Sequence, residues 1–152
     1  MSKKKISLIV LVVCLSLLMA VAVGCSNSDT EKTTTEPKTV TFTDSAERQV
    51  EVPAKVTKIV PSGPLAQIAL FALAPDMLVG LSGKWDPAAE QYLDTKYYNL
   101  PVLGQFYGGK GDLNLEEIAK VDPQVIIDVG QSKSSIVEDM DGITEQVGIP
   151  TV

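Results

Sequence analysis

The stretch "LNLEEIAKVDPQVIIDVGQSK", residues 113–133, combines a short capped helix with the buried strand that follows it. Asn114 is placed to cap the helix, and Glu117 occupies the third helical position, as in a capping box. Pro123 ends the helix, and residues 124–129 form the most strand-like run in the chain. A helix that leads directly into a buried strand is typical of a sheet covered by helices.

The segments before this stretch follow the same pattern. Residues 39–44 and 48–53 alternate apolar and polar side chains around a polar turn, which predicts a two-stranded hairpin. Residues 64–74 are apolar nearly all round, with proline at the first position and Pro75 after the end. They predict a helix that is covered on most sides.

The remaining segments continue the alternation. Residues 77–82 and 100–104 are short apolar runs that suit buried parallel strands. Residues 86–95 and 134–147 predict helices, the second closed by Gly148, and residues 149–152 resemble the start of another strand. The expected fold is therefore α/β, with a doubly wound, mainly parallel sheet and an N-terminal β-hairpin.

Ligands of such sheets sit beyond the carboxyl ends of the strands. The loops predicted at those ends are polar or rich in glycine, and they cover residues 61–64, 82–85, 105–110 and 130–133. We expect them to meet at one rim. Asp128, late in the best strand, could reach this rim or be neutralised inside the fold.

The N-terminus has the pattern of an export signal. Lys3, Lys4 and Lys5 precede a mainly apolar run, residues 6–23, and the sequence "AVGC" ends at Cys25. A transmembrane helix is the alternative, but small residues before a cysteine and the polar tract after it favour a signal peptide over residues 1–24. Residues 25–38 then predict a flexible tether.

The charge and the side-chain types exclude several functions. The chain has 13 basic and 19 acidic residues, and removal of the signal peptide takes away three lysines and no acidic residue. The mature protein then has a formal charge of −9, which disfavours nucleic acid as a partner. The chain has no histidine, and its two cysteines are Cys14 and Cys25, so Ser/His and Cys/His catalysis and histidine- or thiolate-based metal sites are absent from the mature domain. No cofactor and no catalytic residue is expected.

Four segments contain motifs in a characteristic order and spacing: "AVGC", "TVTFTDSAERQVEVP", "KIVPSGPLAQIALFALAPDMLVGLS" and "LPVLG…NLEEIAKVDPQVII". Together they resemble the N-terminal lobe of bacterial ABC-transporter solute-binding lipoproteins of the iron–siderophore, haem and cobalamin type. The resemblance covers residues 39–152 and lacks the second lobe of that family. It implies a lipid on Cys25, an extracytoplasmic location on the cell membrane, an ABC permease as partner and a metal chelate as cargo. It also implies that the glutamate of the "NLE" pattern, Glu116, docks onto the permease; the alternative is a solvated helix-terminal acid.

The rim supplies the candidate ligand-binding residues. Trp85, Phe106 and Tyr107 could stack on a flat ligand, and Tyr107 could ligate haem iron, although ordinary loop packing is the alternative, above all for Phe106. Lys110 and Lys133 could attract an anionic cargo, or be merely solvated. The full predicted set is Ser62, Gly63, Trp85, Gln105, Phe106, Tyr107, Lys110, Gln131 and Ser132.

Two further functions stay open at this point. One is a surface lipoprotein that binds another macromolecule without any small-molecule cargo. The other is a carboxylate-dependent enzyme on a doubly wound sheet, for which no pair of acids on the rim provides a catalytic centre.

Overall fold

The computed structural model describes residues 38–106, 113–130 and 132–152. The predicted signal peptide, residues 25–37 of the predicted tether with the predicted lipidation site Cys25, and the predicted rim residues Tyr107, Lys110 and Gln131 lie outside the described residues. Within the part of the chain that is described, no helix has the length and apolar character needed to cross a membrane.

The predicted N-terminal hairpin is present. Strands β1 (Thr39–Thr43) and β2 (Gln49–Pro53) pair antiparallel, with Thr41 opposite Glu51. The turn between them is built around Asp44, whose carboxylate accepts hydrogen bonds from the backbone N–H groups of Ala46 and Arg48 at 2.9 and 3.0 Å. An aspartate that bonds the backbone a few residues ahead is a common way to form such a turn.

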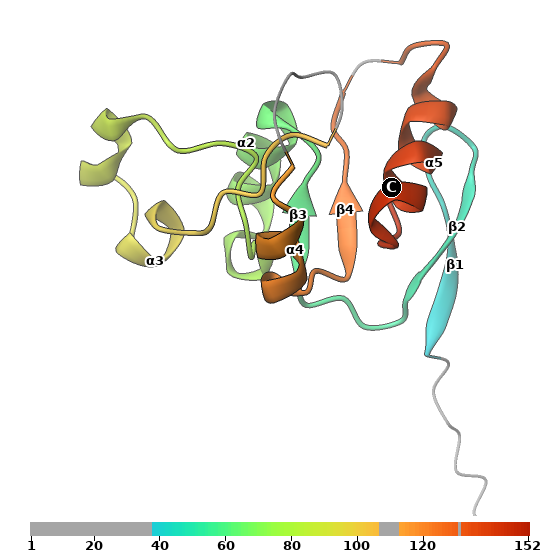
Figure 1. Cartoon of the computed structure of the whole chain (residues 1–152), viewed down its shortest axis with the longest axis horizontal. Helices are drawn as coiled ribbons and strands as arrows, with labels where there is room; N and C mark the ends of the chain where they lie inside the picture. The colour runs from blue at the N-terminus through green and yellow to red at the C-terminus, as the bar shows by residue number, and fades with distance from the viewer. Residues whose placement is uncertain (1–37, 107–112, 131) are drawn as a thin grey trace, which may run out of the picture. The chain divides into compact units, whose positions relative to one another are not determined.

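A parallel strand pair occupies the centre of the structure. Strand β3 (Ile59–Pro61) pairs with β4 (Val125–Ile127) in parallel, as Figure 1 shows. Isolated parallel bridges extend this pairing on both sides, and they join Ile59 to Leu78, Leu81 to Val102 and Ile126 to Thr151. The result is a mixed helix-and-strand unit with two small sheets.

Two of the predicted strands are reduced to these bridges. Within residues 77–82, Met77 belongs to the 3₁₀ helix η1 (Pro75–Met77), and only Leu78 and Leu81 make bridges. Within residues 100–104, Pro101 has no N–H to donate and Gly104 has a φ of 90°, so the chain pairs only at Val102. The prediction of full strands in these two segments is wrong.

The longest helices lie where the sequence predicts them. Helix α2 (Pro64–Leu73) starts with proline after Gly63 and ends before Pro75. Helix α5 (Ile136–Val147) is closed by Gly148 at φ 71°. The helix expected over residues 86–95 is instead the 3₁₀ helix η2 (Pro87–Gln91), followed by the one-turn α3 (Thr95–Tyr98), because the carboxylate of Asp94 accepts from Lys96 N–H and starts a new turn.

Helix α4 (Leu115–Val121) confirms half of the predicted capping box. The side chain of Asn114 accepts a hydrogen bond from Glu117 N–H at 3.0 Å. The reciprocal bond does not form, because the N–H of Asn114 donates to the carbonyl of Leu103 at 2.9 Å. The Glu117 carboxylate lies 2.6 Å from Lys120 Nζ instead.

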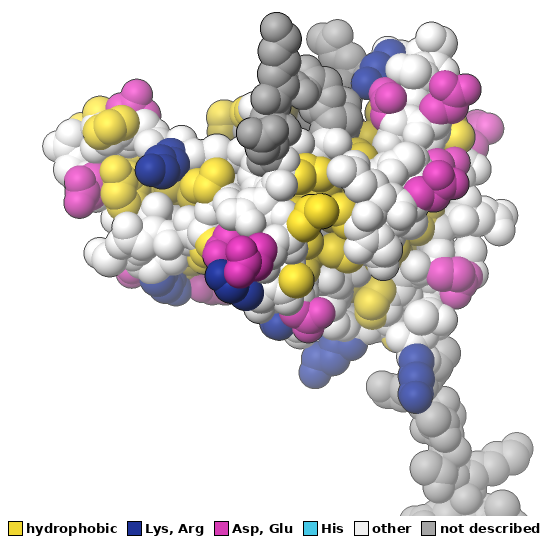
Figure 2. Space-filling view, in the orientation of Figure 1, with side chains coloured by type: hydrophobic (Ala, Val, Ile, Leu, Met, Phe, Trp, Pro, Cys, Tyr) yellow, Lys and Arg dark blue, Asp and Glu magenta, His cyan; other side chains and the backbone are white. Residues whose placement is uncertain are grey.

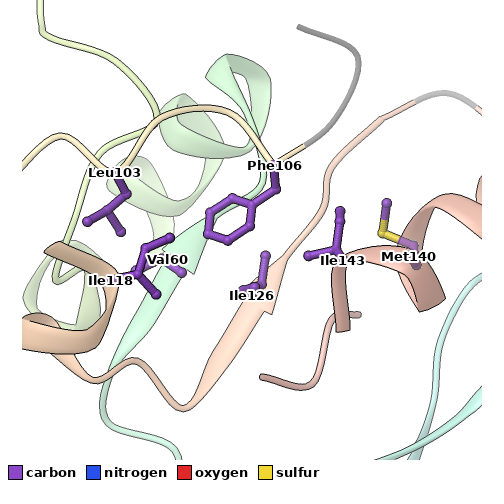
Figure 3. Packing of buried hydrophobic residues seen from close by; sticks show 7 residues of the cluster. All are labelled: Val60, Leu103, Phe106, Ile118, Ile126, Met140 and Ile143. Carbon is purple, nitrogen blue, oxygen red and sulfur yellow. The ribbon is translucent and has the colours of Figure 1, made fainter. Parts of the chain in front are cut away.

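Adjacent residues of β3 face different hydrophobic clusters. Ile59 packs with Leu70 of α2, together with Leu78 and Leu81. Val60 packs on the other face with residues of β4, α4, α5 and the loop before α4, which are Leu103, Phe106, Ile118, Ile126, Met140 and Ile143 (Figure 3). Helix α2 therefore covers one face of the central strands, and α4 and α5 contribute to the cover of the other.

Candidate functional site

The carboxyl ends of β3 and β4 are joined to a third loop by Ser62. Its backbone N–H donates to the carbonyl of Ile127 at 3.0 Å, and its carbonyl accepts from Phe106 N–H at 2.9 Å. Its hydroxyl donates to Oδ1 of Asp128. The side chain of Ser62 is only 2% exposed, so these bonds hold the loops after β3 and β4 and the loop at residue 106 in one place.

A hollow of about 230 Å³ lies where these loops part. From Ser62 the chain continues into α2 on one face of the strands, whereas from Asp128 it continues toward α5 on the other face. Loops that diverge in this way leave a crevice at the strand ends, where ligands of parallel sheets bind. The hollow is lined by Ser62, Gly63, Pro64, Leu65, Ala66, Gln105, Asp128 and Val129.

A second hollow, of about 320 Å³, lies on the other side of Asp128. It brings in the hairpin turn, the predicted residue Ser132 and the start of α5, and its lining consists of Asp44, Ser45, Ala46, Asp128, Gly130, Ser132, Ile136, Met140 and Val152. Among the described residues, Asp128 is the one that lines both hollows.

The Asp44 carboxylate in this second hollow is held in its charged form. Burial opposes ionisation and by itself would raise its pKa, but hydrogen bonds from the backbone and guanidinium of Arg48 and from Ala46 N–H outweigh it. The pKa of Asp44 therefore lies below its usual value. This carboxylate is already engaged by Arg48, at 2.7 Å.

Trp85 belongs to a separate hollow of about 490 Å³, and none of the described residues that line it also lines either of the other two. Its indole N–H donates to the carbonyl of Tyr97 at 3.2 Å, and its ring meets Phe71 edge-on at 5.2 Å between centroids. The structure therefore brings Ser62, Gly63 and Gln105 together but does not bring Trp85 to the same hollow.

Two other predicted rim residues have partners within the chain. The ring of Phe106 is 6% exposed and packs in the core (Figure 3), which is the packing alternative rather than a stacking surface for a ligand. Lys133 Nζ lies 2.5 Å from Asp139 on α5, and this bond holds the pKa of Asp139 below its usual value. Figure 2 shows acidic side chains around α5, which carries four of them: Glu138, Asp139, Asp141 and Glu145.

Sequence reasoning did not identify Gln67 as a positioning residue. Its buried side-chain oxygen accepts from Ser82 N–H at 2.7 Å, from the Ser82 hydroxyl at 2.9 Å and from Gly83 N–H at 3.2 Å. It therefore shapes the start of the loop that carries Trp85. The available signal was that Gln67 is the lone polar side chain in α2.

Glu116 lies apart from these hollows and is not among their lining residues. Its side chain is 84% exposed, and its nearest charged partner is Lys120 Nζ at 3.9 Å. The geometry leaves its carboxylate accessible from solvent. Among the described residues, no group of three or more His, Cys, Asp or Glu side chains could hold a metal ion.

No family model matches the sequence, and no curated protein matches it. Solved structures do match. An ABC transporter solute-binding protein from Sulfurospirillum deleyianum superposes with a TM-score of 0.59 at 24% identity, over 74% of this chain and 35% of that one. This chain has the fold of ABC-transporter solute-binding proteins.

Two further solved structures support the same fold. The molybdate periplasmic binding protein MolA of Haemophilus influenzae has a TM-score of 0.52 at 20% identity, over 74% of this chain and 33% of its own. A periplasmic solute-binding protein from Veillonella parvula has a TM-score of 0.51 at 20% identity, over 75% and 34%. The chain thus spans about one third of the length of the solute-binding proteins that it matches.

Proposed function

We propose that this chain is the N-terminal lobe of the substrate-binding lipoprotein of an ABC importer. It captures a metal chelate, such as a ferric siderophore, haem or cobalamin, and delivers it to the permease. The observation that carries the proposal is the hollow between Ser62 and Asp128, at the joined carboxyl ends of β3 and β4. In the complete protein, the parallel pairings around these strands would extend into a doubly wound sheet.

Exposed apolar surface supports a second lobe that is not part of this chain. Leu65, Ile68 and Leu73 on the outer side of α2 are 57, 61 and 83% exposed. Between α2 and the hairpin lies a groove of about 350 Å³ with an entirely apolar lining, formed by Phe42, Val52, Val56, Ile59, Leu70, Ala74, Met77, Val125, Ile127 and Val152. Extended apolar surface of this kind usually marks an interface, and the rest of a two-lobe protein would cover it.

The side chains available to a ligand favour a chelate over a bare metal ion. The whole sequence contains no histidine, so this lobe cannot offer the imidazole ligands on which bare-ion sites commonly rely. Gln105 and Asp128 instead contribute amide and carboxylate groups beside the apolar side chains of Leu65 and Val129. Such a wall suits the organic shell of a chelate, and it supports a binding role rather than catalysis.

The N-terminal sequence supports attachment to the membrane. We propose that residues 1–24 are removed, that Cys25 is lipidated, and that residues 25–38 tether the lobe on the extracytoplasmic side of the cell membrane. Glu116 would then meet the permease, because its side chain is exposed and lies outside the hollows.

Calorimetric titration with a ferric siderophore, haem and cobalamin tests this function. The full 152-residue chain should bind each of them weakly or not at all, because one lobe leaves much of the ligand in water. The same chain continued by its second lobe should bind one of them at submicromolar concentration.

Two results would contradict the proposal. Submicromolar binding by the 152-residue chain alone would mean that the site does not lie between two lobes. A two-lobe protein that binds none of the three chelates would remove the transport role and favour a surface interaction module.

A further inference from the structure

The outer edge of strand β1 is open to solvent. Strand β1 (Thr39–Thr43) pairs with β2 on one side, and each of its residues is exposed (Figure 1). Among the described residues, no strand or bridge pairs with its other side. The strand contains no proline, charge or bulge, which are the devices that usually protect such an edge. An edge of this kind can bind another strand through its backbone.

The hydrogen bonds of the hairpin show which backbone groups point outward. Asp44 N–H donates to the carbonyl of Arg48, and the carbonyl of Lys38 accepts from Ala54 N–H, both at 3.0 Å. Every second residue of an antiparallel strand bonds to the same neighbour. The even-numbered residues of β1 therefore bond to β2. The N–H and carbonyl groups of its three threonines point to the open side.

The sequence of β1, TVTFT, matches itself when a second copy runs antiparallel to it. With Thr41 opposite Thr41 of the other copy, each threonine faces a threonine, and Val40 faces Phe42. Both members of each threonine pair point outward, so their backbone groups meet as a hydrogen-bonded pair. Threonine pairs and pairs of an aromatic with a β-branched residue are favourable across strands. Since β1 contains no charged residue, no like charges meet along it.

The side chains of β1 also favour a partner strand of this composition. Val40 and Phe42 are 42 and 48% exposed, and they lie on one face of the hairpin with Val50 and Val52, which are opposite them in β2. A second copy would extend this apolar face with its own valine and phenylalanine, while the threonine side chains stay on the other face. Antiparallel sheets commonly have one apolar and one polar face.

We propose that β1 is an interface at which two copies of this chain pair antiparallel about Thr41. The occupant is a second copy because this register gives every residue of β1 a favourable partner from the same sequence. The inference goes beyond the proposed function and does not depend on the cargo. Two strands of this length bury less area than a standard stable interface, so the pair is weak and transient.

Cysteine cross-linking of the full chain in intact bacterial cells tests the register. Hydrogen-bonded antiparallel pairs have Cα atoms about 5.5 Å apart, which a disulfide can span. Thr41→Cys should therefore form a disulfide-linked dimer under oxidation, which accumulates even transient pairs. Thr39→Cys should not, because the two copies of residue 39 would lie about 14 Å apart. Producing Thr39→Cys and Thr43→Cys chains together, with different tags, should restore the cross-link between them.

A proline substitution tests the backbone pairing. Thr41→Pro removes the outward N–H and leaves the bonds to β2, since proline is tolerated where an edge strand turns its N–H to solvent. In the chains that carry Thr39→Cys and Thr43→Cys, it should lower the initial cross-linking rate at least tenfold, as expected for two lost hydrogen bonds. Thr41→Val is the matched control, because it keeps the N–H and should keep the rate.

The remaining outcomes contradict the proposal. The unchanged protein, which contains Cys14 and Cys25, sets the background. No dimer of Thr41→Cys above this background, or equal rates for Thr41→Pro and Thr41→Val, would mean that β1 does not pair with a second copy. Self-cross-linking of Thr39→Cys as fast as the mixed pair would exclude this register. A disulfide between Thr41→Cys and a different protein would assign the edge to another partner.

Discussion

Arg48 Nη2 donates a hydrogen bond to the backbone carbonyl of Thr151, 2.8 Å away and 103 positions later in the chain. The same guanidinium lies 2.7 Å from Asp44 in the hairpin turn and 2.7 Å from Asp141 on α5. The side chains of Arg48 and Asp44 are only 10 and 8% exposed. One largely buried cation therefore ties the hairpin to the last helix and to the last extended segment.

Replacing Arg48 should destabilise the fold strongly. We expect Arg48→Met to lower the free energy of unfolding by about 3–5 kcal/mol, because it leaves the carboxylate of Asp44 buried without its partner. Urea unfolding followed by circular dichroism measures the change. Lys120→Met removes an exposed ion pair and is the control, with a change of about 1 kcal/mol or less. A loss in Arg48→Met no larger than in the control would contradict the structural role.

The pKa of Asp44 makes part of the stability depend on pH. Because this pKa is lower in the folded chain than in the unfolded chain, where it is about 3.9, the contribution is present above that value and is lost as pH falls through the folded pKa. Thermal midpoints measured from pH 6 to pH 2.5 should fall less steeply for Asp44→Asn than for the unchanged protein. The pKa values of Asp76 and Asp139 are also lowered, so the thermal midpoint should still depend on pH to some extent in both proteins. Identical slopes would count against this assignment.

Gly80 has no room for a side chain. A Cβ at this position would lie 2.4 Å from Cδ1 and 2.7 Å from Cγ of Leu103, which is fully buried and cannot move aside freely. Gly80→Ala should therefore cost about 1–3 kcal/mol of unfolding free energy through overpacking. Gly83→Ala meets no atom within 4 Å and should change stability little. Adding Leu103→Val to Gly80→Ala should recover part of the loss, and equal stabilities of the two alanine variants would show that the contact relaxes without cost.

Cys25 should carry the lipid of the mature protein. Cys25→Ala should abolish labelling with a radioactive fatty acid. It should also leave the protein either unprocessed or released, because the polar tether does not bind the membrane without the lipid. Cys14→Ala, within the predicted signal peptide, should retain the label. Undiminished label in the Cys25 variant would exclude it as the lipidation site.

Glu116 and Glu117 should have separable roles. In the two-lobe protein, Glu116→Lys should impair uptake while ligand affinity is kept, because its exposed carboxylate is free of the core and lies outside the hollows. The loss of one helix-terminal acid should cost only about 0.3–1 kcal/mol. Uptake, affinity and thermal midpoint are measured together, with Glu117→Lys as the comparison.

Glu117 contacts Lys120 at 2.6 Å, so its reversal should act mainly on stability. Normal uptake by the Glu116 variant would remove the docking role and leave an ordinary surface acid.

Local sequence rules located the elements whose limits depend on neighbouring residues. Pro64 and Pro75 bound α2, Gly148 closes α5, and Asn114 caps α4, because each acts through its own backbone or through an N–H group three residues away. The alternation of apolar and polar residues was likewise enough to predict the hairpin and its antiparallel pairing.

The candidate site could be predicted only in part. Placing Ser62, Gly63 and Gln105 at strand ends was sufficient to predict a shared rim, and these three do line one hollow. The packing of Phe106 in the core was foreseen as the alternative to ligand stacking. The separate hollow of Trp85 was not predicted, since it depends on how Gln67 holds the loop after residue 81.

The amino-acid sequence by itself determined α2, α4 and α5, the hairpin and the polar character of the strand-end loops. Tertiary structure alone decided that Asn114 N–H bonds Leu103 rather than Glu117, that Asp128 stands between two hollows, and that Arg48 reaches Thr151. The physical reason is the same in each case. Partners so far apart in sequence become neighbours only after the strands pair, and a buried polar group then bonds to whichever partner that packing brings within reach.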